Sequence, residues 1–322
     1  MLRVERDGAQ TLVRINYSSL SVLQTCNRKA LYDLRERWQP KAVRAPLVYG
    51  NAMHKALEAF YLLPREMRGM PGDFDDVSQL LAHGHLPDSA APIYGPVRAF
   101  VQAAQPLQSL PDTDARSVAS GVWVLGHYFR TYENDVYVIH VDHDGPVVER
   151  QFRMQLCEDK AVRIELFGQI DFVLRNEATG ELLPGDHKTS SQMGKDFFNR
   201  IKPNHQYTGY LMGAQFALGL SGENFMVNGI QSKAKPITAR GGPPTFTRQI
   251  TRRTQEDFAE FRDVVKNAVA QYLRNEESGV WPLGSADACG MWSGCQYLDV
   301  CSAPNELRQN ILSAKFEKSH GT

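Results

Sequence analysis

Apolar residues along this chain follow a helical period at first and a strand period from the middle onward. Four early segments place apolar residues three and four positions apart, which predicts helices: 18–37 (capped by Ser18 or Ser19), 49–61, 97–104 and 113–132. Four later segments alternate apolar and polar residues, which predicts strands: 136–140, 147–155, 162–175 and 181–188. The pattern ends with a helix over 204–220, a hairpin of strands 225–233 and 245–251 across the turn at 241–244, and an amphipathic helix over 254–277.

This order of elements predicts an α/β or α+β fold, with a central mixed sheet flanked by helices and a helical N-terminal layer. The 322 residues are enough for one large domain or two small ones. We interpret the chain as one domain, with a mainly helical part at 1–135, a core at 136–277 and a cysteine-rich segment at 278–322. Residues 62–96, rich in Pro, Gly and Asp, are interpreted as an insertion with one short helical segment at 77–82.

Charge and hydropathy argue against a membrane protein but do not identify a partner. The 36 basic and 36 acidic residues cancel, although local patches rather than net charge set the electrostatic field. Basic residues cluster at 28–44 and 240–253, where a solvated basic face explains them as well as a binding surface does. No apolar run is long enough to span a bilayer, and the first ten residues lack the apolar core of a secretion signal. We therefore expect a cytoplasmic protein, or one in the host cytoplasm if it is viral.

Two acidic residues occupy neighbouring predicted strands. Asp171 ends a buried Gly-Gln-Ile-Asp stretch, and a buried carboxylate is costly unless it is paired or binds a metal. On the next strand Asp186 and Lys188 share one face, whereas His187 points away. Two carboxylates form a hard oxygen site suited to Mg²⁺ or Mn²⁺, beside a lysine that can orient or deprotonate a water. A buried Asp–Lys ion pair next to a structural aspartate explains the same spacing.

Two further motifs flank these strands in the sequence. Gly50-x3-His54 opens the second predicted helix, and Gln206-x3-Tyr210 places both side chains on one face of a later helix. The ordered set of Gly-x3-His, Gly-x-Ile-Asp, Asp-x-Lys and Gln-x3-Tyr resembles the PD-(D/E)xK nuclease superfamily, specifically its RecB/Cas4-like branch. The resemblance extends from about Cys26 to Cys301.

The resemblance implies a Mg²⁺- or Mn²⁺-dependent deoxyribonuclease. It implies that His54, Asp171 and Asp186 bind the metal ion and that the backbone carbonyl of His187 completes the shell. Lys188 would act on the nucleophilic water. The implied substrate is DNA, at ends or in single strands, and the implied activity is that of an exonuclease in DNA repair, recombination, or CRISPR or phage DNA processing.

The resemblance also gives roles to the helix that follows Lys188. Gln206 and Tyr210 would orient this lysine and contact the DNA backbone. Other acids carry no motif: Glu58 is interpreted as solvated rather than as a helper ligand, and the strand residues Glu149 and Glu165 cannot be told from surface acids.

Four of the five cysteines lie near the two ends of the chain. A disulfide framework is not expected without secretion, so metal ligation or burial is the better interpretation. Cys26, Cys289, Cys295 and Cys301 can hold a [4Fe–4S] cluster or Zn²⁺, or can be buried free thiols. Their spacing lacks the Cys-x2-Cys pair that is typical of structural zinc. Cys157 lies on a predicted strand and is interpreted as a core residue.

The resemblance favours the iron–sulfur cluster. Cas4-like and AddB-type nucleases use one early and three late cysteines, and Cys26 and the group from Cys289 to Cys301 have the same arrangement here. The usual late pattern is Cys-x2-Cys-x5-Cys. In this chain Trp292 stands in place of the first of those cysteines, Cys289 lies three residues earlier, and Cys295-x5-Cys301 follows the pattern.

Two other classes of function compete with a nuclease. One is a DNA-binding module with an idle site, and the other is a zinc-stapled structural protein without a nucleic-acid role. The chain has no Gly-x4-Gly-Lys-Ser/Thr loop, so we expect no nucleoside triphosphate as a partner. DNA is the expected partner, and no membrane is expected.

Overall fold

The computed structural model describes residues 2–8, 10–72, 74, 91–235, 242–290 and 294–319. The chain divides into two compact units, and each is assembled from stretches that are distant in sequence. Unit 1 consists of Met1–Val43, Arg153–Gly168 and Gln255–Thr322, and unit 2 consists of Arg44–Phe152 and Gln169–Thr254. The strands β7 (Val148–Glu158) and β8 (Val162–Asn176) pair with each other, and the residues of each strand are divided between the two units. The domain boundaries given above remain a prediction.

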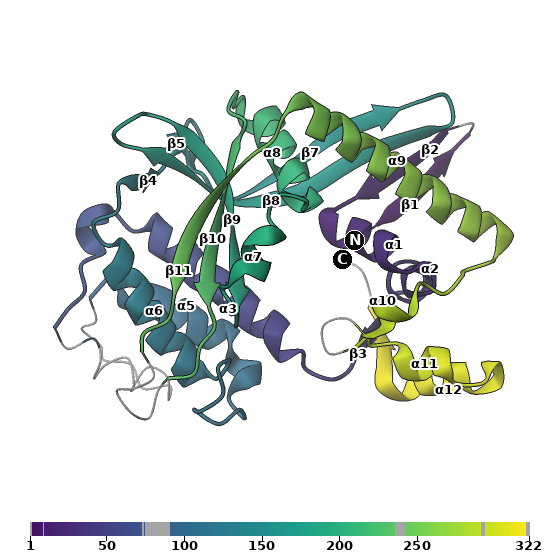
Figure 1. The fold of residues 1–322 in the computed structure, drawn as a ribbon, viewed down its shortest axis with the longest axis horizontal. Coiled ribbons are helices and arrows are strands. Elements are labelled where there is room, and N and C mark those ends of the chain that lie inside the picture. The colour runs from purple at the N-terminus through teal and green to yellow at the C-terminus, as the bar shows by residue number, and fades with distance from the viewer. Residues whose placement is uncertain are drawn as a thin grey trace. The chain divides into compact units, whose positions relative to one another are not determined.

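Unit 2 contains a mixed sheet, as the sequence predicts (Figure 1). Its central strand β9 (Leu182–Ser190) pairs antiparallel with the second half of β8 and parallel with β10 (Asn224–Gln231). β11 (Phe246–Arg252) pairs antiparallel with β10, and β4 (Tyr137–Ile139) pairs antiparallel with β8. The burial of six successive residues in β10 matches a strand that is covered on both faces.

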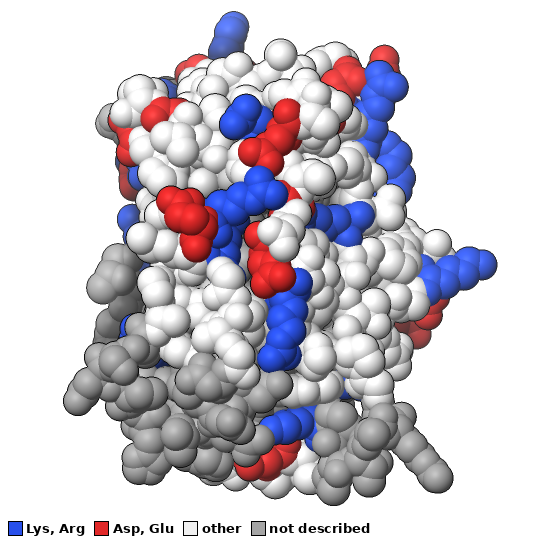
Figure 2. All heavy atoms as spheres, turned by 90° about the vertical axis from the view of Figure 1, so that its left-hand side faces the viewer, with Lys and Arg blue, Asp and Glu red and all other residues white. Residues whose placement is uncertain are grey.

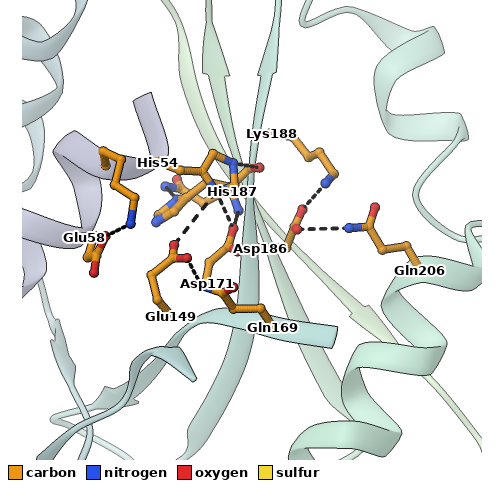
Figure 3. A network of polar contacts seen from close by, with 11 residues as sticks. His54, Glu58, Glu149, Gln169, Asp171, Asp186, His187, Lys188 and Gln206 are labelled. Atoms are coloured by element: carbon orange, nitrogen blue, oxygen red, sulfur yellow. Dashed lines mark hydrogen bonds and ion pairs between the residues drawn. The ribbon is translucent and has the colours of Figure 1, made fainter. Parts of the chain in front are cut away.

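Helices of unit 2 cover the two faces of these strands. Figure 3 shows α3 (Ala45–Leu62) and α8 (His205–Leu218) on opposite sides of the sheet. The buried face of α3 packs into the main core together with α5 (Tyr94–Ala103), α6 (Val118–Tyr132) and apolar side chains of β8, β9 and β10. The remaining elements of unit 2 are short: η2 (Arg65–Met67), η3 (Gln105–Leu107), β5 (Val141–Asp142), β6 (Gly145–Pro146) and α7 (Lys195–Asn199).

Unit 1 combines the two ends of the chain. β1 (Arg3–Asp7) and β2 (Gln10–Ile15) form a hairpin, and β2 pairs parallel with the first half of β8, which also belongs to unit 1. The N-terminal helical elements are α1 (Tyr17–Thr25), α2 (Asn27–Ala30) and a π-helical turn, η1 (Leu31–Arg35). The C-terminal elements are α9 (Gln255–Ser278), α10 (Ala286–Gly290), α11 (Leu298–Ser302) and α12 (Asn305–Lys315). β12 (Phe316–Lys318) pairs antiparallel with β3 (Trp38–Pro40).

The structure corrects the sequence prediction at the N-terminal end. The hairpin of β1 and β2 was not predicted, because its charged residues alternate with only a few apolar ones. The single helix predicted over 18–37 is wrong, because Cys26 has extended backbone angles (φ −165°, ψ 125°) and separates α1 from α2. The cap of α1 is Asn16, whose side chain accepts a hydrogen bond from the backbone N–H of Ser19, rather than Ser18 or Ser19.

Some predicted features lie outside the described residues. These are residues 73 and 75–90 of the insertion, which include the short helical segment at 77–82, together with Gly241 of the hairpin turn and Trp292. Within the described part of the chain, no helix is both long enough and apolar enough to cross a bilayer. Acidic and basic side chains are interspersed on the face shown in Figure 2, which agrees with the net charge of zero.

Candidate active site

The sheet of unit 2 opens into a fork where β8 and β9 separate. Their pairing reaches Phe172 and Gly185, and one further step in the same register brings Asp171 opposite Asp186. Like charges in opposite positions destabilise a sheet, so the fork favours a bound cation. Only glycine fits at Gly185, because a Cβ atom there would lie 2.3 Å from the ring of Phe172 and 2.7 Å from the carbonyl oxygen of Met226.

Asp171 is contacted by residues from α3 and β9 (Figure 3). It is 6% exposed, and its Oδ2 accepts a hydrogen bond of 2.7 Å from the backbone N–H of His187. Nδ1 of His54 lies 3.3 Å from the same oxygen, and Nε2 of His54 lies 3.0 Å from the backbone carbonyl oxygen of His187. Burial and the charge of Asp186 raise the pKa of Asp171 to about 6.

Asp186 lies between a lysine and an amide. It is 2% exposed, and its Oδ2 forms an ion pair of 2.6 Å with Nζ of Lys188. Its Oδ1 accepts a hydrogen bond of 3.2 Å from Nε2 of Gln206. Because the side chain of Lys188 is 31% exposed, its ammonium group can reach a molecule in solvent while it remains beside Asp186.

The position of Gln206 is determined by the start of α8. The side chain of Asn204 caps this helix by accepting a hydrogen bond of 2.9 Å from the backbone N–H of Gln206. The buried guanidinium of Arg253 donates to the carbonyl oxygen of Ile201 and to Oγ1 of Thr208, both at 2.9 Å. These bonds connect the end of β11 to the first turn of α8 and orient Gln206 toward Asp186.

The two residues of Gln-x3-Tyr have different surroundings. Gln206 contacts Asp186 rather than Lys188 directly. The ring of Tyr210, one turn further along α8, packs edge-on against Phe152 with the ring centroids 6.0 Å apart. The roles that the resemblance gives to both residues stay predictions.

Glu149 of β7 belongs to the same cluster, although no sequence motif selects it. Ligand atoms of His54, Glu149 and Asp171 all lie within 4.8 Å of one another. Oε1 of Glu149 is 4.0 Å from Nδ1 of His54, and Oε2 accepts a hydrogen bond from Nε2 of Gln169. Burial, followed by the charges of Asp171 and Glu58, raises the pKa of Glu149 to about 8. Its only sequence signal is its place in a strand that neighbours the Gly-Gln-Ile-Asp strand.

The other two acids considered above form ion pairs. Glu58 lies 2.6 Å from Nζ of Lys55 on the surface of α3. Glu165 lies in unit 1, where Arg14 and Arg163 contact its two oxygens at 3.0 and 2.8 Å. The structure therefore places Glu149 in the acidic cluster and pairs Glu58 and Glu165 with basic residues, a distinction that the sequence does not allow.

The side chain of His187 points away from the fork into a buried polar network. Its Nδ1 lies 2.8 Å from Nδ2 of Asn228, which also donates to the hydroxyl of Tyr128 at 2.7 Å. That hydroxyl is 2.8 Å from the hydroxyl of Tyr61, to which Arg248 donates at 3.1 Å. Burial keeps the pKa of His187 well below its ordinary value, so the ring is neutral and accepts at Nδ1. The network holds the backbone of His187 in the position that Asp171 and His54 contact.

The four terminal cysteines come together in unit 1. Cys26, Cys289, Cys295 and Cys301 all line one small pocket. The backbone N–H of Gly284 donates to Sγ of Cys26 at 3.2 Å. Cys157 lies on β7, as predicted, and lines a different pocket together with residues of α9. The role of the four cysteines as cluster ligands stays a prediction.

The residues at the fork fit a divalent cation. The donors are carboxylate oxygens and one imidazole, a set suited to Mg²⁺ or Mn²⁺. Asp171 is opposite a second aspartate and close to a third carboxylate, that of Glu149, so the site contains more buried negative charge than Lys188 neutralises. A cation of charge two would offset this excess.

We expect the metal-free protein to lose stability as the pH rises. Folding raises the pKa of Glu149 to about 8 and that of Asp171 to about 6, so the folded state binds more protons than the unfolded state above pH 4 or so. The stabilisation by these bound protons is complete below the pKa values that the two carboxyl groups have in the unfolded chain. It is lost as the pH rises through their pKa values in the folded protein. In EDTA, urea denaturation should give an unfolding free energy that falls on the order of 2 kcal/mol between about pH 5 and 9. Saturating Mn²⁺ should reverse the trend, and a flat profile in EDTA would contradict the assignment.

The model of the PD-(D/E)XK nuclease superfamily matches residues 14–302, which is most of the chain. The protein therefore belongs to this superfamily of nucleases, which are hydrolases that act on nucleic acid, and the acidic cluster at the fork could hold the divalent ion that such nucleases use. A comparison with curated proteins gives no match.

Proposed function

We propose that this protein is a Mg²⁺- or Mn²⁺-dependent deoxyribonuclease, and specifically an exonuclease of the RecB/Cas4-like branch. One observation carries the proposal: the fork between β8 and β9 brings Asp171, Asp186 and Lys188 together with His54 of α3. These are the residues that the motifs of this branch select. The protein would process DNA in repair, recombination, or CRISPR or phage pathways.

Each residue of the fork has a chemical role in this proposal. When a divalent ion is bound, it lowers the pKa of a water molecule and offsets charge on the scissile phosphate. Asp171, Asp186 and His54 would hold that ion. Lys188, whose ammonium group is held by Asp186 at 2.6 Å, would orient the attacking water and stabilise the negative charge that develops as this water loses its proton. Gln206 holds the other oxygen of Asp186 and thus limits the positions that this carboxylate can take.

We also propose that Cys26, Cys289, Cys295 and Cys301 hold a [4Fe–4S] cluster in unit 1. Their shared pocket supports a common ligand, and the spacing lacks the Cys-x2-Cys pair of structural zinc sites. The backbone N–H that donates to Cys26 would stabilise a thiolate there. The cluster would be structural, because the chemistry is assigned to the fork in unit 2.

A time course on end-labelled DNA tests the proposed activity. The protein is purified without oxygen and incubated with single-stranded and double-stranded DNA, in Mg²⁺, in Mn²⁺ or in EDTA. Progressive shortening from an end, only when a metal ion is present, is the expected result. Cleavage that persists in EDTA, or products that arise only from internal cuts, would contradict the proposal. Binding without cleavage in either metal would favour the idle DNA-binding module.

A further inference from the structure

We propose that Glu149 is a third carboxylate ligand of the divalent ion, and that it binds the ion together with His54 and Asp171. The inference rests on the proposed metal-dependent function and adds a residue that none of the motifs contains. It makes β7 a third strand of the active site, beside β8 and β9.

The ring of His54 is oriented as a metal ligand would be. Its Nε2 lies 3.0 Å from the carbonyl oxygen of His187, and a carbonyl can only accept, so Nε2 carries the hydrogen and donates. In the neutral ring, Nδ1 then presents a lone pair toward the carboxylates of Asp171 and Glu149. A histidine that binds metal commonly donates its other N–H to a backbone carbonyl in this way. By this assignment the carbonyl of His187 orients His54 instead of completing the metal shell, which differs from the role that the resemblance implies for it.

The distances match one coordination shell. Nδ1 of His54 lies 3.3 Å from Oδ2 of Asp171 and 4.0 Å from Oε1 of Glu149. In an octahedral site with bonds of about 2.0–2.1 Å, neighbouring ligand atoms lie roughly 3 Å apart and opposite ones about 4.2 Å apart. Both distances fall within this range. Asp186 is outside the compact group of three, with its carboxylate between Lys188 and Gln206.

Glu149 is held so that one oxygen points into the site. Gln169 donates to Oε2 of Glu149, which leaves Oε1 on the side of His54 (Figure 3). Gln169 lies two residues before Asp171 on β8 and therefore shares its face of the sheet. The side chain of Glu149 is 17% exposed, so water compensates only part of its charge. The nearest lysine of α3, Lys55, forms an ion pair with Glu58.

Mn²⁺ binding, followed by the loss of the free-ion electron paramagnetic resonance signal, tests this ligand without any measurement of nuclease activity. Glu149→Gln should weaken Mn²⁺ binding at least tenfold. Glu58→Gln is the matched control, because it removes one negative charge from the same electrostatic neighbourhood but leaves the cluster intact. It should change the affinity less than threefold. Equal effects of the two variants, or a change below threefold in Glu149→Gln, would overturn the proposal.

Two further measurements separate the possible failures. Asp171→Asn should abolish Mn²⁺ binding, and if its affinity equals that of the wild type, the proposed metal site itself is wrong. In EDTA, Glu149→Gln should melt no lower than the wild type, because glutamine has the same shape and its carbonyl oxygen can still accept the hydrogen bond from Gln169, whereas the increase in melting temperature with Mn²⁺ should be smaller. If Glu149→Gln does not fold, Glu149→Asp takes its place. The shorter side chain should weaken binding at least threefold, and unchanged affinity would overturn the assignment.

Discussion

Replacing Lys188 by alanine should reduce kcat for DNA cleavage by about 10²- to 10³-fold, the usual cost of removing one group that stabilises charge in the transition state. The expected loss is in kcat, because the ammonium group acts on the attacking water. The affinity for DNA, measured by fluorescence anisotropy in Ca²⁺ or EDTA, should change little. A large change in affinity with kcat intact would show that Lys188 is a DNA contact or an ion-pair partner instead.

Lys266→Ala is the control for this substitution. Lys266 lies on α9 in an exposed ion pair with Asp263, and such pairs contribute about 0–1 kcal/mol to stability. Its removal should leave kcat within about twofold of the wild-type value. The unfolding free energy of both variants should be compared in Mn²⁺, because Lys188→Ala leaves the buried carboxylate of Asp186 without its ion pair when metal is absent.

Replacing Cys26 by serine should bleach the anaerobically purified protein and lower its stability strongly. Cys26 and Cys289 come from opposite ends of the chain, so a cluster that joins them closes a loop of most of the sequence. In the chain-entropy model, a crosslink that closes so long a loop stabilises the folded state by about 5 kcal/mol. Visible absorption and the iron and sulfide content measure the loss of the cluster, and urea denaturation measures the loss of stability.

Cys157→Ser is the matched control, because Cys157 lies on β7 in unit 1 but lines a different pocket. This variant should retain both colour and iron. If the wild-type protein is colourless and contains one zinc ion per chain, the four cysteines form a zinc site and the proposed iron–sulfur cluster is wrong. Equal bleaching by Cys26→Ser and Cys157→Ser would remove the distinction between the two cysteines.

The central part of the fold follows from local sequence pattern. β8, β9 and β10 are segments of strand length with apolar stretches that turn residues or polar residues separate, so their existence and approximate bounds are predictable. The break between α1 and α2 at Cys26 was not predictable from the spacing of apolar residues, because the helical spacing continues through this position. The division into two units depends on which segments pack together, and hydrophobic period carries no such information.

The site was predictable only where its residues occur in motifs. Asp171, Asp186, Lys188, His54 and Gln206 each occupy a motif position, and the structure brings them to the fork. Glu149 could not be selected, because an acid on a strand is common and its proximity to His54 arises from tertiary packing. The backbone of Glu149 has a positive φ of 49°, which is rare for a residue other than glycine and which no strand period reveals.

The two units differ in the time at which their parts leave the ribosome. Unit 2 is complete once residue 254 has been made, whereas unit 1 begins with the first residue and needs the last segment. At about 5–20 residues per second, Cys26 waits on the order of tens of seconds before Cys289, Cys295 and Cys301 exist. A shared ligand of these four cysteines could therefore be fully bound only after Cys301 has been made, when the strands and helices around Asp171 have had time to fold.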